Sequence, residues 1–161
     1  MSKKISYYFF VILFLIANSV YADDFNLKGI KSFYIAIEDM AEDSINCKIS
    51  REDITLSTKY ILSNSLINIK EEYSIDTEVL YIQPTVIFSE KANVCTGAIN
   101  LQTFSFKIVE NSAGYNDVIS KVVSYENLKS VLERPNHYKE FYLENIEEMI
   151  KQFVVEWSKD N

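Results

Sequence analysis

The chain is organised around Val79–Phe88 (VLYIQPTVIF) and Ala98–Val109 (AINLQTFSFKIV), two long apolar segments separated by the polar stretch Ser89–Gly97 (SEKANVCTG). Both segments are rich in β-branched and aromatic residues, which favour strands. The stretch between them is short and ends in glycine. Two strand-like segments on either side of such a loop predict a β-hairpin, and the rest of the fold is predicted outward from it.

Two irregularities interrupt the predicted hairpin. Pro84 has no N–H to donate to a strand ladder, so it belongs on an edge strand or opposite a bulge. In the second segment the apolar positions change phase after Leu101, as they do where a strand carries one inserted residue. Placing Phe88 opposite Ala98 puts Pro84 opposite Gln102, so a single bulge at that point would account for both irregularities.

The segments outside the hairpin alternate between strand and helix patterns. Period-two alternation predicts strands over residues 32–38, 66–72 and 117–126. Residues 51–65 are predicted to form a helix, because Ser50-Arg-Glu-Asp53 carries the residues of a capping box. Residues 127–136 show no single pattern and end in Arg134-Pro-Asn136, which is typical of a helix start.

The C-terminal segment has the clearest helical periodicity in the chain, with a broad apolar stripe of the kind that packs on a core. The stripe consists of Tyr142, Ile146, Met149, Ile150, Phe153, Val154 and Trp157. Two amphipathic helices need one sheet on which to bury their apolar faces. We therefore predict an α+β fold: a two-layer α/β sandwich in which a mostly antiparallel or mixed sheet of about five strands carries two helices on one face.

Residues 1–22 of the 161-residue chain have the composition of a secretory signal peptide. Lys3 and Lys4 precede an apolar run, and Val20-Tyr-Ala22 forms a small-residue cleavage site. The alternative is an uncleaved membrane anchor, although the run is shorter than the ~20 residues of a spanning helix. No cysteine lies near the cut, which argues against a lipid anchor. We predict a single exported α+β domain over residues 23–161, periplasmic or extracellular, with no stable membrane insertion after cleavage.

The mature domain is predicted to be strongly acidic. Loss of the two leader lysines leaves 16 − 2 = 14 basic against 23 acidic residues, a net charge of −9. Such a surface repels phosphate backbones and anionic headgroups, so nucleic acid is not an expected partner. A basic protein partner or a divalent cation stays compatible with this charge.

Cys47 and Cys95 are the only cysteines in the chain. In an exported protein two cysteines favour one disulfide, here joining the hairpin loop to the start of the first helix. Free or metal-binding thiols are the alternative. They would need further ligands, and His137, the only histidine, is distant in sequence.

The sequence contains no glycine-rich phosphate loop, HExxH, GxSxG or CxxC motif, and only three glycines. His137 stands beside a predicted helix start, where a solvated or capping role is common. The acids between Glu38 and Asp43 lack the pattern of an EF-hand loop. The glutamates of the C-terminal helix fit a solvated face, with Glu147 and Lys151 at i, i+4 spacing. We predict no catalytic, cofactor-binding or metal-binding residue, and no enzyme activity.

The aromatic residues divide into an expected core set and an expected exposed set. The core set is Phe104, Phe106, Phe141, Tyr142, Phe153 and Trp157, and the exposed set is Phe33, Tyr34, Tyr81 and Tyr115.

Two functions remain open. One is a non-catalytic protein-interaction or envelope accessory protein that pairs with its partner at an exposed sheet edge. The alternative is a small-molecule binding module with a pocket between helix and sheet.

Overall fold

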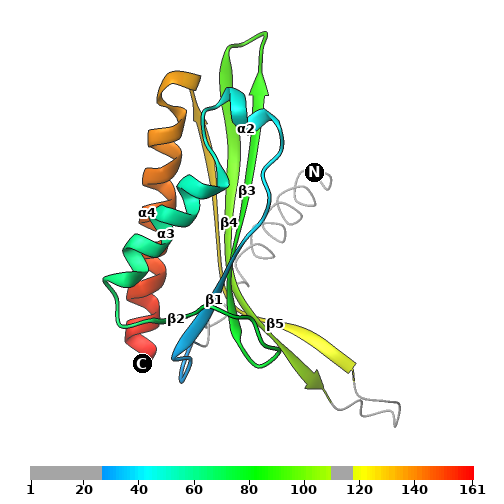
Figure 1. Ribbon diagram of the computed structural model, residues 1–161, viewed down its shortest axis with the longest axis vertical. Helices are drawn as coiled ribbons and strands as arrows, with labels where there is room; N and C mark the ends of the chain where they lie inside the picture. The colour runs from blue at the N-terminus through cyan, green and yellow to red at the C-terminus, as the bar shows by residue number, and fades with distance from the viewer. Residues whose placement is uncertain (1–26, 110–117) are drawn as a thin grey trace, which may run out of the picture.

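The computed structural model describes residues 27–109 and 118–161, which form a mixed five-stranded sheet with helices (Figure 1). The strands are β1 (Ser32–Ile37), β2 (Asn68–Lys70), β3 (Glu78–Ser89), β4 (Val94–Val109) and β5 (Val118–Glu133), and the helices are α2 (Asp43–Asn46), α3 (Arg51–Ser63) and α4 (Pro135–Asp160). The strand order is β2-β1-β3-β4-β5. β1 is parallel to β2 and β3, whereas β3, β4 and β5 are antiparallel neighbours. The predicted α+β sandwich is confirmed, with the short helix α2 in addition to the two expected helices.

The two long helices form one layer against the sheet (Figure 1). α3 begins where it was predicted, because Ser50 accepts a hydrogen bond from the Asp53 N–H while the Asp53 carboxylate accepts one from the Ser50 N–H. α4 begins at Pro135, whose ring suits the first turn of a helix. Among the described residues no helix has the length and the apolar composition needed to span a membrane.

The predicted register of the hairpin is wrong. Phe88 lies opposite Cys95 rather than Ala98, and Pro84 lies opposite Ile99. The predicted loop is therefore too long, and its second half belongs to β4. Of the two positions predicted for Pro84, the structure shows the edge and not the bulge: pairing with β1 ends at Ile82, so beyond that point β3 has a strand on one side only.

The predicted bulge also lies elsewhere. β4 keeps its phase, because Thr103 and Ser105 continue the buried row. The irregularity is on β5, where Tyr125 opposes Thr103 and Val123 opposes Phe104, so Ser124 has no partner across the ladder.

Two strands differ in length from their predictions. β5 continues to Glu133 and takes in most of the segment for which no pattern was assigned. β2 contains only Asn68–Lys70 of the predicted residues 66–72.

The core lies between α4 and the inner face of the sheet. The Phe153 ring packs edge-on against Phe33 and Tyr125, with 5.3 Å between centroids in each pair. The indole N–H of Trp157 donates a 2.6 Å hydrogen bond to the carbonyl oxygen of Ile30. The C-terminal stripe is therefore core, as predicted, apart from the half-buried Val154.

The structure joins Cys47 and Cys95 in a disulfide, with 5.9 Å between their Cα atoms. Both cysteines are buried. Cys47 directly follows α2, and Cys95 is the second residue of β4, so it lies in a strand rather than in a loop. The bond fixes the segment that carries α2 to the tip of the β3–β4 hairpin.

Candidate functional site

The outer face of the sheet is the surface that neither α3 nor α4 covers (Figure 1). Alternate residues of each strand point to opposite faces. On β3 the buried Leu80, Ile82 and Val86 face the helices, so Tyr81 and Ile87 face outward. Among the described elements neither long helix lies on this face, so it is available for binding.

Five aromatic side chains gather on the half of the outer face that is nearest the N-terminal end of β3. We call them the aromatic patch: Tyr34, Tyr73, Tyr81, Phe104 and Phe106. The centroid distances are 5.8 Å from Tyr34 to Tyr73, 5.9 Å from Tyr81 to Phe104, and 5.6 Å from Phe104 to Phe106. These separations are those of edge-to-face aromatic pairs, so the patch consists of one packed pair, Tyr34 with Tyr73, and one packed trio, Tyr81 with Phe104 and Phe106.

The patch spans neighbouring strands because of the strand register. Tyr34 on β1 lies opposite Val79 on β3, and Val79 lies opposite Phe104 on β4. Tyr81, two residues beyond Val79, therefore projects from the same face as Phe104. Val79 is buried beneath its aromatic neighbours, although it belongs to the outer face.

Polar groups of both signs border the patch. The Tyr81 hydroxyl donates a 2.6 Å hydrogen bond to the Glu38 carboxylate, and this bond raises the pKa of Tyr81 to about 12. The Lys121 ammonium lies 4.1 Å from the centroid of the Phe104 ring, a cation–π contact. Gln102 accepts a hydrogen bond from Lys121 and donates one to Glu126. The exposed apolar surface therefore has a fixed polar rim.

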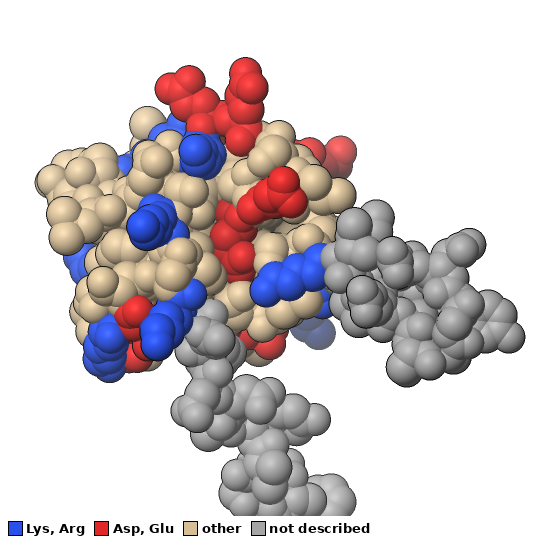
Figure 2. Space-filling model, turned by 90° about the horizontal axis from the view of Figure 1, so that it is seen from below, with Lys and Arg blue, Asp and Glu red and all other residues tan. Residues whose placement is uncertain are grey.

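A groove with a volume of about 800 Å³ continues from the patch around the end of the sheet. Tyr73 and Phe106 belong both to the patch and to the groove wall. The charged lining consists of Lys31, Lys70, Lys107, Glu72, Asp76 and Glu78. Figure 2 views this end of the molecule, where acidic side chains cross the middle of the face and basic ones flank them. Because the groove is lined by charges of both signs, it favours neither a small anion nor a small cation as a ligand.

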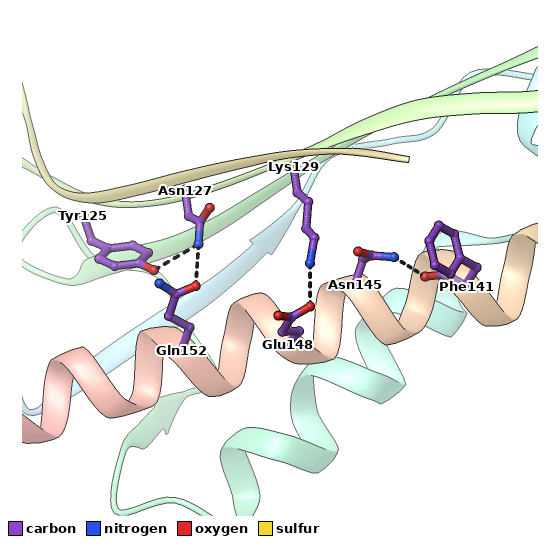
Figure 3. A network of polar contacts seen from close by, with 7 residues as sticks. All are labelled: Tyr125, Asn127, Lys129, Phe141, Asn145, Glu148 and Gln152. Carbon is purple, nitrogen blue, oxygen red and sulfur yellow. Dashed lines mark hydrogen bonds and ion pairs between the residues drawn. The ribbon is translucent and has the colours of Figure 1, made fainter. Parts of the chain in front are cut away.

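The edge strand β5 is held to α4 by a polar network (Figure 3). Asn127 donates hydrogen bonds to Gln152, at 3.2 Å, and to the Tyr125 hydroxyl, at 3.4 Å. Lys129 forms an ion pair with Glu148, which lowers the pKa of that carboxyl. The inner-face side chains of β5 thus contact α4, whereas the outer-face side chains and the unpaired backbone edge of β5 point away from it.

The polar residues that the sequence analysis considered as candidate site residues lie apart from one another in the structure. His137 lies exposed in the first turn of α4. Asp39 pairs with Arg51 at 2.7 Å, and Asp43 accepts a hydrogen bond from the Phe88 N–H, so the acids of the loop serve different partners. Within residues 27–109 and 118–161 no three metal-ligating side chains gather in one place.

The glutamates of α4 likewise take separate partners. Glu147 pairs with Lys151 at 3.2 Å, and Glu148 pairs with Lys129 on β5. Neither pair faces the groove.

The predicted division of the aromatic residues is partly wrong. Phe33 is buried, whereas Phe104 is half-buried on the outer face and Phe106 and Phe141 are exposed. Tyr34 and Tyr81 are half-buried on the outer face, and Tyr115 lies outside the described residues. The signal for the patch was available in the sequence, because Phe104 and Phe106 occupy the phase opposite to Ile99 and Leu101.

No protein-family model matches the chain, and no curated protein matches it. Among solved structures, a minor lipoprotein from Acinetobacter baumannii is similar at 12% sequence identity. The match covers 83% of this chain and 94% of that chain, with a TM-score of 0.40. A likeness this distant supports no conclusion about this chain.

Proposed function

We propose that this protein is an exported, non-catalytic binding protein that holds a protein partner on the outer face of its sheet. The observation that carries the proposal is the aromatic patch: a packed aromatic pair and a packed aromatic trio on neighbouring strands, partly exposed, with a polar rim. Exposed apolar surface of this kind marks interaction sites. Tyrosine and phenylalanine are also enriched at the centres of protein interfaces.

The charges around the patch favour a partner segment that combines apolar and basic side chains. Glu38 and Glu126 are exposed at its border, and the domain without its leader carries a net charge of 14 − 23 = −9. An acidic surface speeds the encounter with a basic partner. Glu72 and Asp76 in the adjoining groove extend the acidic border, while the lysines of the groove suit a segment that also carries acids.

The non-catalytic part of the proposal rests on side-chain chemistry. His137 stands in the first turn of α4. The acids that the sequence singled out take separate partners: Asp39 pairs with an arginine, Glu147 and Glu148 with lysines, Glu38 with a tyrosine, and Asp43 with a backbone amide. The alternative of a ligand pocket between helix and sheet gains no support at the centre of that interface, because Phe33, Tyr125 and Phe153 pack together there.

Export is supported by the leader composition and by the buried disulfide. Disulfides persist in oxidising compartments outside the cytoplasm. The leader itself lies outside the described residues. Intact-mass measurement of the native protein tests this part: we expect a chain that begins at Asp23, and a mass that retains residues 1–22 would contradict cleavage.

The partner site is tested by affinity capture with matched baits. The baits are the leader-cleaved protein, a patch variant (Tyr81→Ser with Phe104→Ser) and a control variant (Leu56→Ser with Tyr60→Ser) that removes two exposed apolar side chains of α3. All three are first shown to be folded by circular dichroism. We expect a partner that the wild type and the control capture and the patch variant loses. Equal capture by all three baits would place the partner elsewhere, and capture by none would oppose the binding function.

A further inference from the structure

The long free edge of the sheet is β5. It pairs with β4 along its whole length, and no strand in the described part of the chain pairs with its other side. The opposite edge, β2, has only three residues. A long unpaired edge is a template for another strand, and proteins protect such edges unless pairing is wanted.

The outer row of β5 is apolar at its centre and charged at its ends. Leu128 and Leu132 are 67% and 65% exposed on the side of the sheet away from α4. Ser130 lies between them, Glu126 precedes them, and Arg134 follows. The Arg134 side chain forms no ion pair with a described residue, and it makes no capping bond to α4.

This row is complementary to itself, and we propose that β5 pairs antiparallel with β5 of a second copy of this chain, about a two-fold axis through Ser130. In that register Leu128 faces the partner's Leu132, and Glu126 faces the partner's Arg134. The two-fold axis repeats each pair, as in any isologous interface. Opposed side chains of antiparallel strands lie close enough to interact, at about 4.5–5.5 Å between Cβ atoms.

The neighbouring registers are less favourable. An axis through Lys129 places two lysines opposite each other, which is destabilising. An axis through Val131 places Leu132 opposite the partner's Ser130 and Leu128 opposite the partner's Arg134. In the Ser130 register the inner row has no like-charged pair: Asn127 faces the partner's Glu133, and Lys129 faces the partner's Val131.

The proposed pairing joins two five-stranded sheets into one of ten strands. Leu128, Ser130, Leu132 and Arg134 lie at the end of β5 remote from the aromatic patch, and Glu126, at the border of the patch, is the one residue that both proposals use. Both patches would stay open on the same side of the joined sheet. A dimer would then carry two separate copies of the binding surface.

The first test is a charge exchange, followed by analytical ultracentrifugation of the leader-cleaved protein over a concentration series. We expect a wild-type dimer. Arg134→Glu should weaken dimerisation by about tenfold or more, because two attractive pairs become repulsive. Adding Glu126→Arg to that variant should restore the dimer. A monomeric wild type, or a dimer that Arg134→Glu does not weaken, would overturn the proposal.

The second test places a cysteine on the proposed axis. Cross-strand Cα atoms are within the range that a disulfide spans. Ser130→Cys should therefore give a covalent dimer on oxidation, whereas Ser63→Cys, at an exposed position of α3, should not. Equal cross-linking by the two variants would contradict the register. Partner capture should be unchanged by Arg134→Glu, so failure of the dimer and failure of the binding function are separable.

Discussion

The Tyr81 hydroxyl donates a hydrogen bond to a carboxylate oxygen of Glu38, 2.6 Å away, and so ties the aromatic patch to the residue that follows β1. The bond fixes the phenol in its neutral form, because ionised Tyr81 would place a negative charge beside Glu38. It therefore connects the geometry of the patch to a measurable titration.

Tyr81 should titrate above the pH range of an ordinary tyrosine. In the wild type Tyr81 should ionise near pH 12, and Glu38→Gln should lower its pKa toward 10 by removing the charged acceptor. Because the folded pKa is raised, the stabilisation is complete below about pH 10 and is lost as the pH rises toward 12. NMR of ring-labelled tyrosine measures the pKa of Tyr81. An unchanged Tyr81 titration in the variant would contradict the role of Glu38.

Gly97 should tolerate no side chain. A Cβ atom there would lie 2.1 Å from the Thr85 carbonyl oxygen and 2.4 Å from the Tyr138 hydroxyl oxygen. Gly97→Ala should lower the free energy of unfolding by about 1–3 kcal/mol, the cost of overpacking. Lys59→Ala, at an exposed position of α3, is the control and should stay within about 0.5 kcal/mol of the wild type. Equal stability of the two variants in urea would show that β3 and α4 shift to accept the methyl group.

The disulfide should contribute stability rather than activity. Its cysteines are separated by 48 residues, for which the loop-entropy relation gives about 4 kcal/mol. The double variant Cys47→Ala/Cys95→Ala should lose that order of unfolding free energy and still capture its partner at a temperature where it stays folded. Thiol labelling of the denatured wild type should require prior reduction. Two labels without reduction would refute the bond.

The end of α4 should carry a large share of the core. Phe153 is fully buried between Phe33 and Tyr125, so Phe153→Ala should cost about 3–5 kcal/mol of unfolding free energy. Trp157→Ala should fall in the same range, because it also removes the hydrogen bond to Ile30. Losses below about 1 kcal/mol for both variants would mean that this stripe does not anchor the sheet.

Local patterns predicted the layers of the fold but not the strand register. The capping box at Ser50 and the stripe of α4 were sufficient because each depends on residues within a few turns. The register failed because Thr103 and Ser105 are polar residues at buried positions. Their polarity hid the unbroken alternation of β4, so a phase change was inferred where none exists.

The candidate site was missed for the same reason. With an incorrect phase, Phe104 and Phe106 were assigned to the core, although they face outward. Sequence periodicity also does not show which sheet face the helices leave bare. That depends on the side of the sheet to which α3 and α4 return, a tertiary property of the whole chain.

Site-specific photo-crosslinking in cells that express the protein tests the partner site most directly. Phe106 and Phe141 are a matched pair, 37% and 41% exposed, one on the aromatic patch and the other on α4. A benzophenone amino acid at Phe106 should give a cross-linked partner on illumination, and the same amino acid at Phe141 should give none. Cross-linking from Phe141 but not Phe106, or from neither position, would contradict a partner on the outer face.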